Sequence, residues 1–241
     1  MTLAVGVPLV ADKGIVNGAS FSRDTVVSPG SLASLFGVNL AARAEAAVSV
    51  PLPTTLGGTQ VLVNDMAAPL FFVSPTQINF QVPAEVAGTS MIVVVASGND
   101  LSPPATTPVA PQGPGIFTAA ASGAGQAAVL NQDGSANSAQ NPAAAGSVLQ
   151  IFATGLGATN PPAATGQPGA LSPPFNVTVQ QPIVLVGGSA ADVEFSALAP
   201  GFVGLYQVNA RIPAATAAGN SVTLQVQMGG RNSNLVTIAV R

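Results

Sequence analysis

The chain has 241 residues, with six Lys or Arg against nine Asp or Glu and a formal net charge of −3. Charged residues make up 6% of it, where a soluble domain typically carries roughly 25%, and Cys, His and Trp are absent. These absences exclude a thiolate or imidazole zinc site, an iron–sulfur cluster, a cysteine nucleophile and a Ser-His-Asp triad. Six basic residues are too few for the basic surface that nucleic acids require. We therefore expect no enzyme, no cofactor and no nucleic-acid partner.

Short runs rich in β-branched residues occur along the whole chain, bounded by Gly, Pro, Asn, Asp or Ser, a pattern typical of strands and turns. The clearest runs are 61–64, 91–95, 183–186, 222–228 and 235–240. In the run 222–228, Val, Leu, Val and Met alternate with Thr and Gln, which indicates one buried and one solvent-exposed face. Only 40–48 (LAARAEAAV) suits one or two helical turns. The chain is therefore predicted to be all-β and built from β-sandwiches.

The same motifs recur in the same order in the two halves of the chain, which indicates an internal repeat. The matched segments are 14–20 with 115–121, 29–36 with 145–152, 61–64 with 184–187, and 77–83 with 207–213. This repeat predicts two tandem immunoglobulin-like sandwiches, at 14–110 and 111–241. A stiff Pro- and Gly-rich connector joins them near 108–114, and an extra strand at 1–13 precedes them.

Several longer motifs resemble one known family. They include VSPGSLASLFG, PLFFVSPTQINFQVP, GQAAVLNQDGSANSAQNPA and LAPGFVGLYQVNARIP. These are similar to the Solibacter-type C-terminal domain of secreted acidobacterial proteins, and the resemblance covers 14–241. It implies tandem immunoglobulin-like, IPT/TIG-like folds in a bacterial protein that is extracellular or at the cell surface, and it implies no activity.

Neither an export signal nor a membrane span is expected within this sequence. The first eleven residues lack the basic region and the long apolar core of a signal peptide. No run approaches the ~18 consecutive apolar residues of a membrane-spanning helix.

The segment before the repeat has larger apolar residues at every second position, Leu3, Val5, Val7 and Leu9, which is a strand pattern with one face fit for burial. One interpretation is that this segment pairs with an edge of its own sandwich. The other is that 2–10 pair with a neighbouring copy, head to tail, and so build a filament. The predicted function is then a structural subunit of an extracellular filament or surface assembly, and its partners are copies of itself.

The alternative prediction is a secreted binding or adhesion module. Its loops 97–107 and 157–181 would recognise a polysaccharide or a surface protein. With no Trp and one Tyr, the aromatic faces common in carbohydrate-binding modules are hard to assemble. The phenylalanines in the predicted strands are therefore expected in the core; these are Phe71, Phe72, Phe80, Phe152 and Phe195.

Two groups of oxygen-bearing side chains are candidates for chemistry. Asn131, Asp133 and Ser135 have the alternate spacing of a calcium loop, although Asp133-Gly134 is also the residue pair of a tight hairpin turn. Asp192 and Glu194 lie two apart on one strand face, where we expect a solvated surface or a partner for Arg211 rather than a catalytic pair.

Three further polar side chains are predicted to support the fold. Asn79 and Asn209 occupy equivalent positions in apolar strands; if they are buried, we expect their amides to bond to neighbouring loop backbone. Tyr206, the single tyrosine, precedes the second of these strands and is expected to anchor a loop through its hydroxyl.

Overall fold

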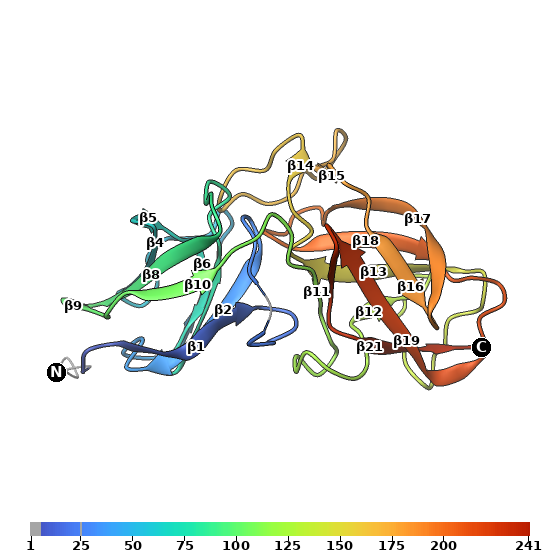
Figure 1. Cartoon of the computed structure of the whole chain (residues 1–241), viewed down its shortest axis with the longest axis horizontal. Coiled ribbons are helices and arrows are strands. Elements are labelled where there is room, and N and C mark those ends of the chain that lie inside the picture. Colours follow the sequence, from blue (N-terminus) through green and yellow to red (C-terminus); the bar gives the residue numbers. More distant parts are fainter. Residues whose placement is uncertain (1–5, 25) are drawn as a thin grey trace.

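The computed structural model describes residues 6–24 and 26–241, and this part of the chain consists of strands, turns and loops without a helix. Two β-sandwiches lie one beside the other along the long axis of the molecule (Figure 1). The prediction of an all-β fold is therefore confirmed. No helix that could span a membrane occurs in the described residues.

The first sandwich is made of two antiparallel sheets, in the strand orders β1-β2-β7-β6-β3 and β10-β8-β4-β5, with β9 beside β8. Its strands are β1 (Leu9–Asn17), β2 (Leu32–Val38), β3 (Glu45–Ala46), β4 (Thr59–Val63), β5 (Met66–Ala67), β6 (Leu70–Val73), β7 (Gln77–Gln81), β8 (Ser90–Ser97), β9 (Asp100–Leu101) and β10 (Ala105–Pro108).

In the second sandwich one long strand, β17, belongs to both sheets, because one part of it pairs with β18 and the other with β16. The strand order is β11-β13-β18-β17-β16-β19-β20. Outside this order, β12 pairs with β13, β21 with β19, and β15 with both β14 and β17. The strands are β11 (Gly115–Ile116), β12 (Val129–Leu130), β13 (Val148–Thr154), β14 (Thr159–Asn160), β15 (Val177–Thr178), β16 (Ile183–Val186), β17 (Ser189–Leu198), β18 (Tyr206–Arg211), β19 (Gly219–Met228), β20 (Arg231–Asn232) and β21 (Val236–Val240).

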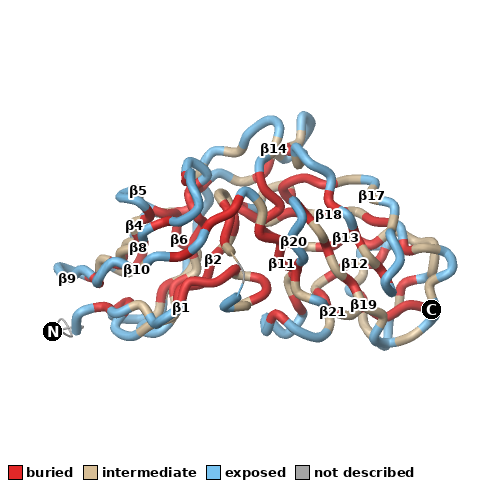
Figure 2. The backbone as a smooth tube through the Cα atoms, in the orientation of Figure 1, coloured by how far each residue is buried: buried red, intermediate tan, exposed pale blue. Residues whose placement is uncertain are grey.

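Side-chain alternation explains why these runs form strands. In β19, Leu224, Val226 and Met228 are buried, whereas the Gln residues between them are half-buried on the other face. Such alternation places one face of each sheet inside the sandwich. Figure 2 shows the result as buried stretches within each lobe and exposed loops around them.

Each sandwich has its own hydrophobic core. One core runs from Ile15 to Val109 in the chain and contains the fully buried Phe80. The other runs from Ile116 to Val240 and includes Tyr206. Of the connector residues 108–114, Val109 belongs to the first core.

The two sandwiches repeat the same strand register around their central strands. Ser34 lies opposite Asn79 as Gln150 lies opposite Asn209, and a bulge interrupts the pairing on the other side of each central strand. The repeat seen in the sequence is therefore matched in space at these central strands.

The prediction of helical turns at 40–48 is wrong. Leu40 and Ala41 are buried in the first core, and Glu45–Ala46 form β3, which pairs with β6. Burial of Leu40 and pairing of the backbone outweigh the helix propensity of the alanines.

The end of the extra strand predicted at 1–13 belongs to β1. β1 begins at Leu9, and Leu9 and Val10 pair within the same chain with Val38 and Gly37 of β2. A bulge follows between Val10 and Ile15. Leu3 and Val5 lie outside the described residues.

Candidate binding site at the domain junction

A buried asparagine joins the end of β1 to the connector. The Asn17 side chain is fully buried; its Nδ2 donates to the Gly113 carbonyl at 2.8 Å, and its Oδ1 accepts the backbone N–H groups of Ala19 and Ser20. The amide thus satisfies backbone groups of both the first sandwich and the connector, which is the requirement for burying it.

A second buried side chain joins the two sandwiches directly. Thr154 Oγ1, at the end of β13, accepts the backbone N–H of Leu32 at 2.8 Å and donates to the Gly204 carbonyl at 2.8 Å. Gly204 has a φ of +63°, and a Cβ there would lie 2.8 Å from the Leu32 side chain. The close approach at this point therefore requires glycine.

The loop that carries β14 and β15 extends over the junction, as the yellow-to-orange ribbon in Figure 1 shows. Gly166 donates to Gln81 Oε1 at 2.7 Å and accepts the backbone N–H of Leu52 at 3.1 Å. Thr165 Oγ1 accepts the Ala84 N–H and donates to the Glu85 carboxylate. Part of the predicted binding loop 157–181 is thus held against the first sandwich.

Beneath this loop lies a cavity of about 420 Å³, in the size range of small-ligand sites. Its wall comes from the end of β7, Ala84 and residues 86–88 of the first sandwich, from connector residues 109–112, and from residues 157–159 and 162–163 of the second. None of the described residues that line it is charged. Its wall combines the C–H surfaces of Pro, Ala and Val with a few amide and hydroxyl groups, so it suits an uncharged ligand.

Two polar side chains of the cavity differ in their bonding. Tyr206 is buried and donates its hydroxyl to the Gly157 carbonyl, as the sequence led us to expect of a loop anchor. Burial raises the pKa of Tyr206 well above its ordinary value of 10.0, because it disfavours the phenolate. Gln112 donates to Gln180 at 3.4 Å, which leaves its Oε1 without a protein partner among the described residues.

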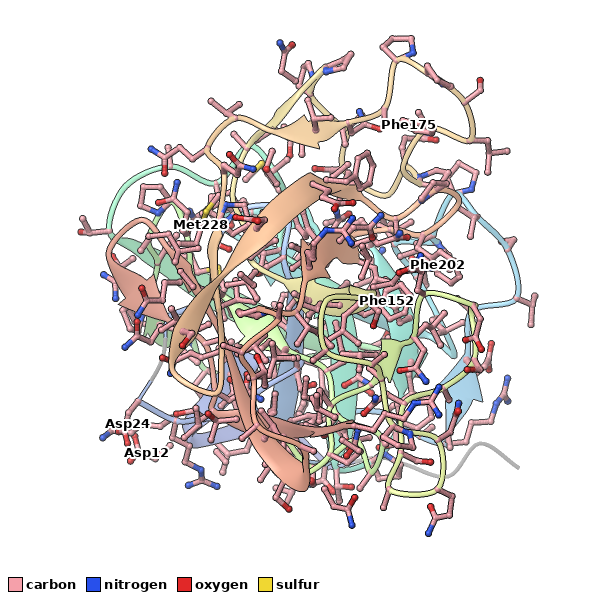
Figure 3. All side chains as sticks on the ribbon, turned by 90° about the vertical axis from the view of Figure 1, so that its right-hand side faces the viewer. Asp12, Asp24, Phe152, Phe175, Phe202 and Met228 are labelled. Carbon is pink, nitrogen blue, oxygen red and sulfur yellow. The ribbon has the colours of Figure 1, made fainter. Side chains whose placement is uncertain are left out.

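An exposed apolar pair lies on the loops next to the junction. Leu171 and Phe202 are 79% and 59% exposed, and a Cβ on Gly201 would lie 3.3 Å from the Leu171 side chain. The Phe202 loop is fastened by bonds between the backbones of Gly169 and of Gly201 and Phe202. In Figure 3 Phe202 lies on the same side of the second sandwich as Phe152 and Phe175.

The calcium candidate is folded as a turn. Gly134 donates to the Asn131 carbonyl, and both the N–H and the hydroxyl of Ser135 donate to Asp133 Oδ1. These bonds lower the pKa of Asp133 below its ordinary range. Asn131 Oδ1 is occupied by Asn137. The described residues contain no cluster of three or more His, Cys, Asp or Glu fit for a metal ion.

The acidic pair on β17 is exposed. Glu194 forms an ion pair with Arg211 at 2.5 Å, with both side chains almost half exposed, and Asp192 lies opposite Arg211 in the sheet. The expectation of a partner for Arg211 is confirmed.

The equivalent asparagines have different partners from those expected. Asn79 and Asn209 are half-buried on the outer sheet faces, and each Oδ1 accepts the side-chain amide of the Gln two residues earlier on its strand. The bonds to loop backbone expected for buried asparagines are absent, because both side chains are only half-buried and a neighbouring side chain lies within reach on the outer face.

The core assignment of the phenylalanines holds only for Phe80, which is fully buried. Phe71, Phe72, Phe152 and Phe195 are half-buried. Phe72 and Phe195 lie on outer faces because a bulge in β6 and another in β17 set the register of these strands.

The other predicted binding loop, 97–107, is largely strand. It contains β9, which pairs with β8, and most of β10. Gln112 and Gln81 also line the cavity, and the sequence does not predict them as site residues. No local pattern distinguishes them, and only the packing of the two sandwiches brings them together.

Several solved structures of low sequence identity are similar to this chain in fold. SGBP-B of the Bacteroides ovatus mixed-linkage glucan utilization locus, in complex with a mixed-linkage heptasaccharide, has 13% identity and a TM-score of 0.38, over 99% of this chain and 46% of that one. SGBP-B of a Bacteroides uniformis xyloglucan utilization locus has 12% identity and a TM-score of 0.30, over 97% and 49%. Domains 5–6 of the S-layer protein SbsC have 13% identity and a TM-score of 0.28, over 97% and 98%. The chain thus spans less than half the length of the two SGBP-B chains.

A comparison of the sequence with curated proteins finds no match. A family model does match part of the chain, residues 17–109, which cover most of the first sandwich; the more specific Solibacter-type assignment stays a prediction. By this match, the first sandwich contains an IPT/TIG domain, an immunoglobulin-like fold.

Proposed function

We propose that this chain is an extracellular binding module that holds a segment of an uncharged polysaccharide at the junction of its two sandwiches. The observation that carries the proposal is the cavity of about 420 Å³, to which both sandwiches and the connector contribute. Its uncharged wall suits the C–H faces of sugar rings, and Gln112 adds a side-chain amide to this wall.

The junction is well suited to hold such a ligand in one geometry. Thr154, Gln81 and Asn17 each bond across it, so the two walls of the cavity are fixed relative to each other before binding. Preorganised walls lower the entropic cost of association.

The test is isothermal titration calorimetry of the whole chain with soluble neutral polysaccharides of β-linked glucose, xylose and mannose. Ala158 is exposed and lines the cavity, so Ala158→Trp should fill it and weaken binding by about tenfold or more, as a built-in steric clash does. Ala164→Trp is the matched control, because Ala164 is exposed on the same loop outside the lining.

Tyr206 supplies an independent readout. It is the single tyrosine of a chain without tryptophan, and its ring lines the cavity, so a ligand there should change the intrinsic fluorescence of the wild-type chain. If Ala158→Trp, Ala164→Trp and the wild type bind with equal affinity, the cavity is not the binding site.

A second candidate function, that of a filament subunit, is favoured by exposed apolar residues at and just before the start of β1. Val7 and Leu9 are 59% and 52% exposed, and β1 is an edge strand of its sheet. An exposed apolar edge invites pairing with another chain.

This candidate is tested by deleting residues 1–6, which leaves β1 complete, whereas deletion of 1–13 would remove part of β1 itself. Electron microscopy should show fibres for the full chain and none for the deletion. Fibres from both would refute a need for residues 1–6 in strand donation, because Val7 and Leu9 remain in the deletion.

A further inference from the structure

The outer face of each sandwich carries the same arrangement of two amide side chains on the central strand. On β7 these are Gln77 and Asn79, joined by a bond of 2.8 Å from Gln Nε2 to Asn Oδ1. On β18 they are Gln207 and Asn209, joined in the same way at 2.9 Å. Residues two apart on a strand point to the same face, so both amides of each pair are displayed together.

The internal bond leaves the same two groups free in each pair. Among the described residues, neither the Asn Nδ2 group nor the Gln Oε1 atom has a protein partner, at 77 and 79 or at 207 and 209. Each face therefore offers one amide donor and one amide acceptor. The Gln–Asn bond fixes which end of each amide points outward.

Aromatic rings flank both amide pairs. In the first sandwich Phe72 lies opposite Asn79 and Phe36 lies opposite Gln77. Directly opposite residues of an antiparallel pair lie on the same face of the sheet. Phe36 is half-buried and packs against Phe21, with 6.3 Å between ring centroids.

The second sandwich repeats this arrangement. Phe195 lies opposite Asn209 and Phe152 lies opposite Gln207. Phe195 packs edge-on against Phe175 at 5.9 Å between centroids, and Figure 3 shows Phe152 and Phe175 on the same side of this sandwich. The rings are half-buried, so part of each is held by the protein and part faces solvent.

Each of the two faces lies close to the domain junction, one in each sandwich. Thr154, which bonds to Leu32, is two residues beyond Phe152 on β13, and Leu32 is two residues before Ser34 on β2. Each step of two residues is about 7 Å along a strand. Because the junction is fixed by buried bonds, the two faces keep a constant spacing.

We propose that these faces are two equivalent binding platforms for the sugar rings of one neutral polysaccharide chain. Neighbouring hydroxyl groups of a sugar each donate and accept, so one hydroxyl donates to Gln Oε1 while the next accepts from Asn Nδ2. The phenylalanines contact the apolar C–H faces of the rings. The first platform carries no charge. On the second, Arg211 is paired with Glu194 and lies opposite Asp192, so no unpaired cation is offered to an anionic ligand.

The proposal takes its ligand class from the proposed function but names different residues from those of the cavity. Two platforms on one rigid chain make the binding bivalent. A polysaccharide that spans both platforms should therefore bind more tightly than an oligosaccharide that fits on one of them.

The test removes the free donors. Asn79→Asp and Asn209→Asp keep the oxygen that accepts from Gln, but each replaces the amide NH2 group with a charged oxygen that cannot donate. In calorimetry with neutral hexasaccharides and polymers of β-linked glucose, xylose and mannose, each variant should bind the polymer about threefold to tenfold more weakly, the usual effect of one lost hydrogen bond. In the double variant the gain in affinity with chain length should disappear.

Asn64→Asp is the matched control. Asn64 is exposed, its Oδ1 accepts the Ile92 N–H at 2.8 Å, and its Nδ2 has no protein partner among the described residues, so the substitution makes the same chemical change away from both platforms. Its affinity should equal that of the wild type. Circular dichroism of every variant verifies that the fold is kept.

The outcomes separate the two proposals. Weaker binding in the Asp variants with unchanged binding in Ala158→Trp supports the platforms and refutes the cavity. Unchanged binding in both platform variants, with loss in Ala158→Trp, overturns the platforms alone. If no neutral saccharide binds the wild type, or if a protein partner binds and depends on Asn79, the ligand class is wrong.

Discussion

The junction between the sandwiches should depend strongly on one hydroxyl group. Thr154→Val keeps the shape of the side chain and its preference for strands. It removes the acceptor for the Leu32 N–H and the donor to the buried Gly204 carbonyl, each at 2.8 Å. A buried polar group left without a partner costs about 1–3 kcal/mol, and the Leu32 site is only partly buried, so the two together should cost about 2–4 kcal/mol.

The assay is equilibrium unfolding in urea, followed by circular dichroism. The free energy of unfolding should fall by that amount, with the midpoint shifted and the slope unchanged. Thr107→Val is the control, because Thr107 is buried in β10 and makes no side-chain hydrogen bond in the described structure. If Thr154→Val and Thr107→Val unfold at the same midpoint, the two hydrogen bonds do not hold the junction.

Three further predictions follow from single sites. Asn137→Ala should lower the free energy of unfolding by about 2–4 kcal/mol in the same assay, because the buried amide bonds to both backbone groups of Ala239 and to Asn131. Asn141→Ala is the control, because the amide of Asn141 is exposed. A smaller loss for Asn137→Ala than for Asn141→Ala would contradict this role. Millimolar calcium or EDTA should leave the melting temperature unchanged, since Ser135 occupies Asp133 Oδ1, and a rise with calcium would restore the metal-site interpretation. Because burial raises the pKa of Tyr206 in the folded state above its ordinary value of 10.0, stability should be retained below that pH and lost above it. Phenolate absorbance should then appear together with unfolding by circular dichroism, and ionisation while the chain is still folded would refute the burial argument.

Some features of this protein were determined by local sequence. Alternation in the run that became β19 specified a strand with one buried face, because side chains alternate across any extended backbone. Asp133-Gly134 specified a turn, since Gly134 takes a φ of +82° that few other residues adopt readily. The repeated Gln-x-Asn was visible as well, and it was the available signal for the outer faces. Its bonding depended on whether the two asparagines are buried, which the local sequence does not decide.

Other features depended on pairing between distant segments. Whether Phe72 and Phe195 point inward or outward is set by the bulges opposite β7 and β18, since one extra residue reverses the face of a side chain. The binding cavity depends on contacts such as that between Leu32 and Thr154, which are 122 residues apart. Periodicity along a chain indicates which face of a strand is apolar, but it does not predict which distant segment will pack against that strand. Only the tertiary structure therefore decided where the two sandwiches meet and which of their side chains remain free to bind.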